Sequence, residues 1–318
     1  MRSDGGSLEG AERLAHIAVD LGAHAVVCCS TPAASARIAQ IAAAAGVTLL
    51  SPTGEPDRVG GVEGWQFLLS PGEATALQAI VRDAYARDLT ALGLLTLQGS
   101  FGDAVRARLE SYLGAPGLRI VGDARYPPNA TVLTPEALFV ATRVPDAIVV
   151  WGLRADSGLA VEGLRARGWN GPVYLRPALL APLAGGAPPG LSGDVRVPVS
   201  PASLPDAVQP EDPRASWLFD ARTLGDGRLE SRPFQADGAT MHDALTLLAR
   251  AFEQVATYGV DHSDVRSVRI ATRDALIGLA PARLAAGTYD LSMDDRAAAL
   301  ADGLVTALFE DGRLRPLR

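Results

Sequence analysis

The sequence predicts an α/β fold of parallel strands joined by crossover helices, and three observations carry this prediction. Short apolar runs alternate along the chain with longer stretches whose apolar residues recur at helical spacing. Glycines such as Gly46 and Gly168 follow the expected helices, where they suit C-caps. With 318 residues and 48% apolar composition, the chain can bury a large core and exceeds the usual size of one domain, so we expect two lobes.

The first expected elements are helix, strand, helix and strand. The apolar run 23–28 lies between Gly22 and a Ser-Thr-Pro stretch, which favours a strand buried on both faces. The Ala-rich stretch that follows is typical of a helix. The predicted bounds are helix 11–21, strand 23–28, helix 33–45 and strand 47–50.

The same alternation continues towards the C-terminus. The predicted bounds are helices 72–86, 102–113, 135–142 and 156–167, and strands 91–97, 118–124, 147–151 and 172–175. Proline and glycine are dense over 185–213, where we expect one strand, 193–199. Helices at 236–258 and 263–276 follow, and an Asp-Gly turn at 311–312 predicts a terminal hairpin of strands 304–309 and 314–317.

Composition and motifs exclude several classes of function. The formal charge is −7, and the 29 basic residues are all arginines scattered along the chain, which argues against a nucleic-acid groove. No nucleophile elbow, phosphate loop or metal-binding spacing occurs, and the four histidines lie far apart. We therefore expect no catalytic residue, no metal and no cofactor. The neighbouring Cys28 and Cys29 are interpreted as small strand-end residues rather than a redox pair, because adjacent cysteines strain a disulfide.

Candidate solute-contacting residues follow from the predicted strand ends. Parallel sheets bind ligands beyond the carboxyl ends of their strands. The residues expected there are Ser30, Thr31, Thr53, Glu55, Phe101, Trp151, Arg154 and Arg176. Ser30 or Thr31 could bind a ligand, cap the next helix, or do both. Glu55 suits an ammonium group and the arginines suit a carboxylate, unless Glu55 and an arginine pair with each other.

The order of several segments resembles a known family. The segments are 26–34, 41–53, 126–131 and 145–152, together with the helix end 164–169 and the closing stretch 302–317. They are similar to type I periplasmic binding proteins, in particular the leucine/isoleucine/valine-binding subgroup of ABC-transporter solute-binding proteins. The resemblance implies two doubly wound parallel-sheet lobes joined by three crossing strands. It places lobe one at 1–90 plus 233–285 and lobe two at 91–232 plus 286–318.

The resemblance also implies a function. The chain would be the solute-binding protein of an ABC importer, a periplasmic monomer that works with a membrane ABC permease, and it would close about a hinge on a solute held between its lobes. Family positions for a serine, a threonine, a tyrosine and an acid fall on Pro32, Glu55, Arg154 and Ala178. This inventory favours a small amino-acid-like or carboxylate solute over a branched-chain amino acid.

Two departures keep alternatives open. The family's first strand and helix have no counterpart, so we expect an N-terminally truncated fold, either because the start of the gene is misassigned or because a degenerate lobe has rearranged. The polar stretch 1–10 shows no apolar leader, so the expected location is cytoplasmic if this start is genuine. The alternatives are an intracellular ligand-sensing protein of the same fold and a doubly wound α/β enzyme acting through Glu55 and an arginine. Neither a DNA-binding helix-turn-helix nor a nucleophile–base pair is evident in the sequence.

Overall fold

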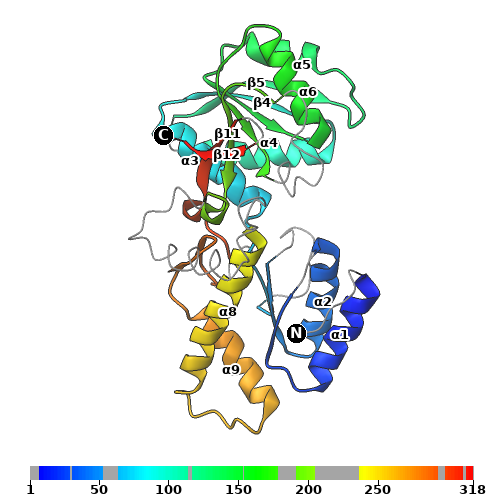
Figure 1. Cartoon of the computed structure of the whole chain (residues 1–318), viewed down its shortest axis with the longest axis vertical. Helices are drawn as coiled ribbons and strands as arrows, with labels where there is room; N and C mark the ends of the chain where they lie inside the picture. The colour runs from blue at the N-terminus through cyan, green and yellow to red at the C-terminus, as the bar shows by residue number, and fades with distance from the viewer. Residues whose placement is uncertain are drawn as a thin grey trace, which may run out of the picture. The chain divides into compact units, whose positions relative to one another are not determined.

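The chain forms two compact units (Figure 1). The computed structural model describes residues 7–28, 31–52, 64–113, 117–152, 154–177, 191–204, 236–292, 298–310 and 313–317. Unit one contains the described residues up to Thr75 and those from 236 to Gly303. Unit two contains the described residues from Ala76 to 204 and those from Leu304 onwards.

These limits differ from the expected lobes of 1–90 plus 233–285 and 91–232 plus 286–318. Residues 76–90 belong to unit two, because Leu77 and Ile80 pack in one core with the strand that starts at Ala91. The described residues of 286–303 belong to unit one, because Thr288 pairs with Arg283 and the Ala298 N–H donates to the Leu68 carbonyl oxygen. The boundary expected at 232/233 lies outside the described residues.

Unit one contains a parallel sheet of three short strands in the order β1-β2-β3. They are β1 (Ala25–Val27), β2 (Thr48–Ser51) and β3 (Gln66–Leu68). Every residue of β2 and β3 is buried, whereas those of β1 are partly exposed. The run 23–28 was expected to form a strand buried on both faces, and this expectation is wrong for β1, because its residues are only partly covered.

Helices cover both faces of this sheet (Figure 1). One face carries α1 (Leu8–Asp20) and α2 (Pro32–Ala44), whose small residues Ala15 and Ala39 pack with Leu49. The opposite face carries α8 (Ala236–Val255) and α9 (Val265–Ile277). Because alanine supplies so much of the interface, helices and strands can approach closely with few aromatic side chains.

Two polar side chains tie distant parts of unit one together. Arg269 of α9 donates hydrogen bonds to the carbonyl oxygens of Val19, Ala23 and Ala45, at distances of 2.8–3.1 Å. A cation suits these positions, because the carbonyl groups at helix C-termini lack intrahelical donors. Asp243 of α8 forms the second tie, to the connection between β9 (Ala282–Arg283) and β10 (Thr288–Tyr289).

Unit two is built on a seven-stranded sheet in the order β12-β11-β8-β7-β6-β4-β5. Its first five strands along the chain are parallel to one another, as the alternating pattern predicts. They are β4 (Ala91–Leu97), β5 (Arg119–Tyr126), β6 (Ala147–Trp151), β7 (Val173–Leu175) and β8 (Val195–Val199). The terminal hairpin of β11 (Val305–Glu310) and β12 (Arg313–Pro316) is confirmed, and β11 adds antiparallel to β8.

Helices also cover both faces of the larger sheet (Figure 1). One face packs against α3 (Glu73–Ala86) and α4 (Ser100–Leu113). The other face packs against α5 (Thr134–Ala141) and α6 (Arg154–Arg165). Two 3-10 turns complete the described elements, at Pro201–Ser203 in unit two and Ala301–Gly303 in unit one. The prediction of a doubly wound α/β fold is confirmed in both units.

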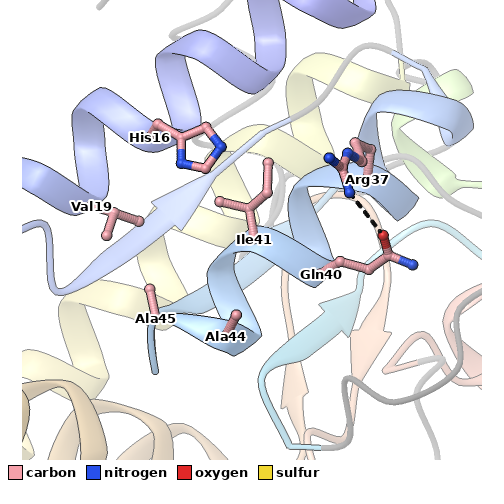
Figure 2. Close-up of a pocket in the computed structure, with 7 residues that line it drawn as sticks. All are labelled: His16, Val19, Arg37, Gln40, Ile41, Ala44 and Ala45. Atoms are coloured by element: carbon pink, nitrogen blue, oxygen red, sulfur yellow. Dashed lines mark hydrogen bonds between the residues drawn. The ribbon is translucent and has the colours of Figure 1, made fainter.

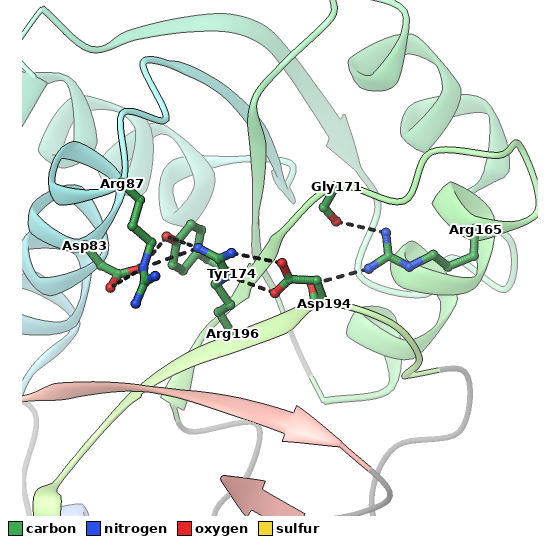
Figure 3. A network of polar contacts seen from close by, with 7 residues as sticks. All are labelled: Asp83, Arg87, Arg165, Gly171, Tyr174, Asp194 and Arg196. Atoms are coloured by element: carbon green, nitrogen blue, oxygen red, sulfur yellow. Dashed lines mark hydrogen bonds and ion pairs between the residues drawn. The ribbon is translucent and has the colours of Figure 1, made fainter. Parts of the chain in front are cut away.

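A polar network fastens α3 to the large sheet (Figure 3). The Tyr174 hydroxyl on β7 donates to Asp83 of α3 at 2.5 Å, and Arg196 of β8 donates to the same hydroxyl at 3.3 Å. Arg196 also makes two hydrogen bonds to Asp194, at 2.8 and 2.9 Å. Burial, followed by the nearby Asp83 carboxylate, raises the pKa of Tyr174, so the phenol stays neutral and can donate.

Candidate functional site

The carboxyl ends of β4 and β7 bring two of the expected residues together in unit two. Phe101 lies in the first turn of α4, which follows β4, and Arg176 directly follows β7. The Arg176 guanidinium lies 5.6 Å from the centre of the Phe101 ring, within the range of a cation–π contact. Since β6 lies between β7 and β4, this pair flanks the end of β6.

Trp151 occupies a different position from Phe101 and Arg176. It ends β6, but its side chain is fully buried in the core formed with α3 and α4. Its carbonyl oxygen accepts a hydrogen bond of 2.6 Å from the Thr96 hydroxyl. Trp151 therefore supports the sheet from within rather than presenting its ring at the strand ends. Arg154 is the first residue of α6, and the position of its side chain is outside what the structure describes.

Sequence reasoning missed a close approach between Tyr126 and Gly152. Tyr126 ends β5, and Gly152 follows β6. A Cβ atom placed on Gly152 would lie 1.7 Å from the Tyr126 hydroxyl oxygen, so any side chain at this position would collide with the phenol. Burial, followed by the charge of Asp156, raises the pKa of Tyr126. A glycine after one strand and a tyrosine before two prolines were the available signals.

A second glycine allows α4 to start close to the sheet. A Cβ atom on Gly102 would lie 1.9 Å from the Leu97 carbonyl oxygen at the end of β4. The first turns of α4 and α6 thus begin at the carboxyl ends of β4 and β6. Helix starts carry free N–H groups and the positive end of the helix dipole. Together with Arg176, they give this edge of unit two groups that favour an anion such as a carboxylate.

In unit one, one of the four expected residues is described. Thr31 caps α2, since its hydroxyl oxygen accepts a hydrogen bond of 3.2 Å from the Ala34 N–H. This confirms the capping role, and the role in ligand binding stays a prediction. Ser30, Thr53 and Glu55 lie outside the described residues.

The interpretation of Cys28 needs correction. It was expected to be a small strand-end residue without a redox role, but Cys28 is disulfide-bonded. The sequence contains one other cysteine, Cys29, which lies outside the described residues. The expectation rested on the strain of joining adjacent cysteines.

A hollow of about 380 Å³ lies between α1 and α2 on unit one (Figure 2). Its lining residues are His16, Val19, Arg37, Gln40, Ile41, Ala44 and Ala45. Arg37 is already engaged there, with Glu12 at 2.9 Å and Gln40 at 3.3 Å. The hollow follows the middle and last turns of α2, whereas the strand ends meet the first turn of that helix. We therefore do not assign it as the solute site.

The described residues offer neither a metal centre nor a membrane span. Within the described ranges, no three His, Cys, Asp or Glu side chains are grouped so that they could hold a metal ion. No described helix has both the length and the apolar character needed to cross a membrane.

The fold has counterparts among known binding proteins. Residues 2–298 match the periplasmic binding protein family, and the chain belongs to that family. The family consists of binding proteins rather than enzymes, so the expectation that the chain is not an enzyme is confirmed on this ground. Members of the family are periplasmic or otherwise extracytoplasmic. No curated protein sequence matches the chain significantly.

Solved structures with the same fold include several transport proteins. A structure from Rhodospirillum rubrum, described provisionally as a branched-chain amino acid ABC transporter, has a TM-score of 0.74 at 21% identity and covers 99% of this chain and 86% of its own. An ABC transporter substrate-binding protein from Desulfitobacterium hafniense, in complex with Leu, has a TM-score of 0.70 at 20% identity. The match covers 99% of this chain and 87% of that protein's chain. A leucine-binding protein from Thermotoga maritima has a TM-score of 0.63 at 16% identity, with coverage of 98% and 84%.

Proposed function

We propose that the chain is the solute-binding component of an ABC importer and binds a small amino-acid-like or carboxylate solute. Family membership supports the binding role, and the names of the solved relatives support amino-acid transport. The observation that carries the solute class is the edge of unit two where Arg176 lies over Phe101 beside the first turns of α4 and α6. This edge offers a cation and free N–H groups to a carboxylate.

The proposed mechanism is a population shift. A solute held by the strand ends of both units stabilises a closed form of the protein by the difference between its affinities for the closed and open forms. The closed, loaded form would then be recognised by a membrane ABC permease. The proposed location is the periplasm, and the proposed working form is a monomer.

A thermal-shift screen tests the proposal. A solute present at about 100 times its Kd stabilises the folded state by about 2.7 kcal/mol, so a matching amino or carboxylic acid should raise Tm clearly. If no amino or carboxylic acid in the screen raises Tm, the proposed solute class is wrong.

Matched variants locate the binding site. Arg176→Ala should abolish the Tm increase given by the best compound of the screen, because the cation at the edge of unit two is lost. Arg143→Ala is the control, since Arg143 also packs on a phenylalanine, at 4.9 Å from the centre of the Phe139 ring, but at the exposed end of α5. Equal losses in the two variants would contradict the assignment of Arg176.

A further inference from the structure

A buried polar cluster lies beneath the first turn of α2 in unit one. It consists of Ser35, Ser51 and Gln66, each at most 3% exposed. The hydroxyl oxygens of Ser35 and Ser51 are 2.6 Å apart, and the Gln66 side-chain N–H donates to the Ser35 hydroxyl at 3.1 Å. The three residues come from α2, from the end of β2 and from the start of β3. One chain of hydrogen bonds thus joins three elements of unit one.

The cluster holds the two elements that lead to the predicted solute-contacting residues of this unit. Ser35 lies one helical turn after Thr31, and its backbone N–H donates to the Thr31 carbonyl oxygen at 3.0 Å. Ser51 is the last residue of β2, two positions before Thr53 in the sequence. The hydroxyl pair therefore fixes where the start of α2 lies relative to the end of β2.

The surroundings of the cluster give no reason to expect polar groups there. The same layer between helices and sheet is filled by Ala34, Ile38, Leu49 and other apolar residues. The side-chain oxygen of Gln66 is buried and has no hydrogen-bond partner within the described chain. An unsatisfied buried acceptor destabilises the fold, so an apolar residue of similar size at position 66 would serve stability at least as well. Hydrogen bonds differ from apolar packing in being directional. Directional bonds can therefore hold the start of α2 in one orientation relative to the end of β2.

We propose that Ser35, Ser51 and Gln66 are positioning residues. They hold the first turn of α2 against the end of β2, so that these two segments are in position before a solute binds. This inference rests on the proposed solute-binding function. The cluster does not touch the solute. It acts through the placement of Thr31 at the start of α2 and of Pro52 after β2, and residues that are in place before binding lower its ordering cost.

The decisive variant is Gln66→Met, which keeps the side-chain volume and removes the amide. Global stability in urea should stay equal or rise, because the unsatisfied oxygen disappears. Amide hydrogen exchange over residues 33–38 should become roughly tenfold faster, while residues 39–45 of the same helix stay unchanged. Thr272→Val is the matched control, because Thr272 is buried in the same unit but donates only to Val268 within its own helix.

Binding gives a second readout, measured with the best compound of the amino-acid and carboxylic-acid screen. Its Kd should weaken about tenfold in Gln66→Met and in Ser35→Ala, and Ser35→Thr, which keeps the hydroxyl, should restore it. If Gln66→Met speeds amide hydrogen exchange equally over residues 33–38 and 39–45 and also lowers the free energy of unfolding, the cluster is purely structural and the proposal is overturned. Unchanged exchange over 33–38 would also overturn it. Because exchange is measured without solute, a failed screen would count against the solute class and leave this test intact.

Discussion

The buried carboxylate of Asp243 allows a quantitative test of what holds unit one together. Asp243 lies on α8 with a fully buried side chain. Its two oxygens accept hydrogen bonds from the backbone N–H groups of Ala285 at 2.9 Å and Ala286 at 2.7 Å. The perturbation is Asp243→Ala, with Asp243→Asn as the milder variant that keeps one acceptor oxygen.

The expected magnitude follows from these two bonds. Each buried N–H that loses its acceptor costs about 1–3 kcal/mol, so two cost about 2–6 kcal/mol. Removing the buried charge also removes its desolvation penalty, which places the expected loss for Asp243→Ala at about 2–4 kcal/mol. Asp243→Asn should lose about half as much. Urea unfolding at pH 7 measures both values, and a loss below about 0.5 kcal/mol in Asp243→Ala would refute the reasoning.

The same residue predicts a pH dependence with a definite sign. Burial raises the pKa of Asp243 above its usual range, and this outweighs the hydrogen bonds from the Ala286 N–H and its other donors, which lower it. Protonation of Asp243 therefore stabilises the folded state. This contribution to the free energy of unfolding is fully present below the unfolded-state pKa of about 3.9, and it is lost as the pH rises through the higher pKa of the folded state.

This sign can be measured against Asp243→Asn, which does not titrate. The stability difference between wild type and Asp243→Asn should grow in favour of wild type as the pH falls from 7 towards 4. The half-exposed ring of His242 lies 3.4 Å from Asp243, so both proteins should also carry His242→Gln. A difference that shrinks as the pH falls would contradict the assignment.

Substitutions at three further features of the described chain can be tested by urea unfolding. Val144→Gly should stabilise the protein by about 1 kcal/mol, because this exposed β-branched residue has φ = 54°. Asp88→Gly should stabilise it less, because Asp88 has φ = 57° and aspartate tolerates this backbone region. A lower free energy of unfolding for Val144→Gly would count against strain at Val144. Arg269→Leu should cost about 2–3 kcal/mol, since three main-chain carbonyl groups lose their donor, and an effect near zero would mean that water replaces the guanidinium. Tyr174→Phe should cost about 1–2 kcal/mol, because Asp83 loses a buried donor, while the exposed Tyr85→Phe should change nothing.

The succession of elements could be predicted because buried parallel strands leave a strong pattern. In β4 and β6 every residue is buried, so β6 appears in the sequence as an uninterrupted apolar run and β4 as one that Gly93 and Thr96 alone interrupt. Strands β9 and β10 contain two residues each and are too short to leave a pattern. The helix α3 follows unit one in sequence but packs on the sheet of unit two, and periodicity does not reveal which sheet a helix will cover.

The candidate site was predictable as a location and less so in detail. The rule of strand carboxyl ends placed Phe101 and Arg176 at one edge, and the structure brings them together. The same rule selected Trp151, whose burial depends on the packing of α3 and α4 and cannot be derived from its position at a strand end. The contact between Tyr126 and Gly152 joins residues from different strands, so only the folded chain reveals it.

The division of the chain into two discontinuous units also constrains how it can fold during synthesis on the ribosome. Both units are assembled from two separate stretches of sequence, and the last strands, β11 and β12, complete the sheet that starts with β4. Until β11 has been synthesised, one edge of β8 is unpaired. Until Arg269 has been synthesised, the carbonyl oxygens of Val19 and Ala23 lack their hydrogen-bond donor. Neither unit can therefore complete its packing from its first stretch of sequence alone, and a chain synthesised only as far as β8 exposes the edge of that strand.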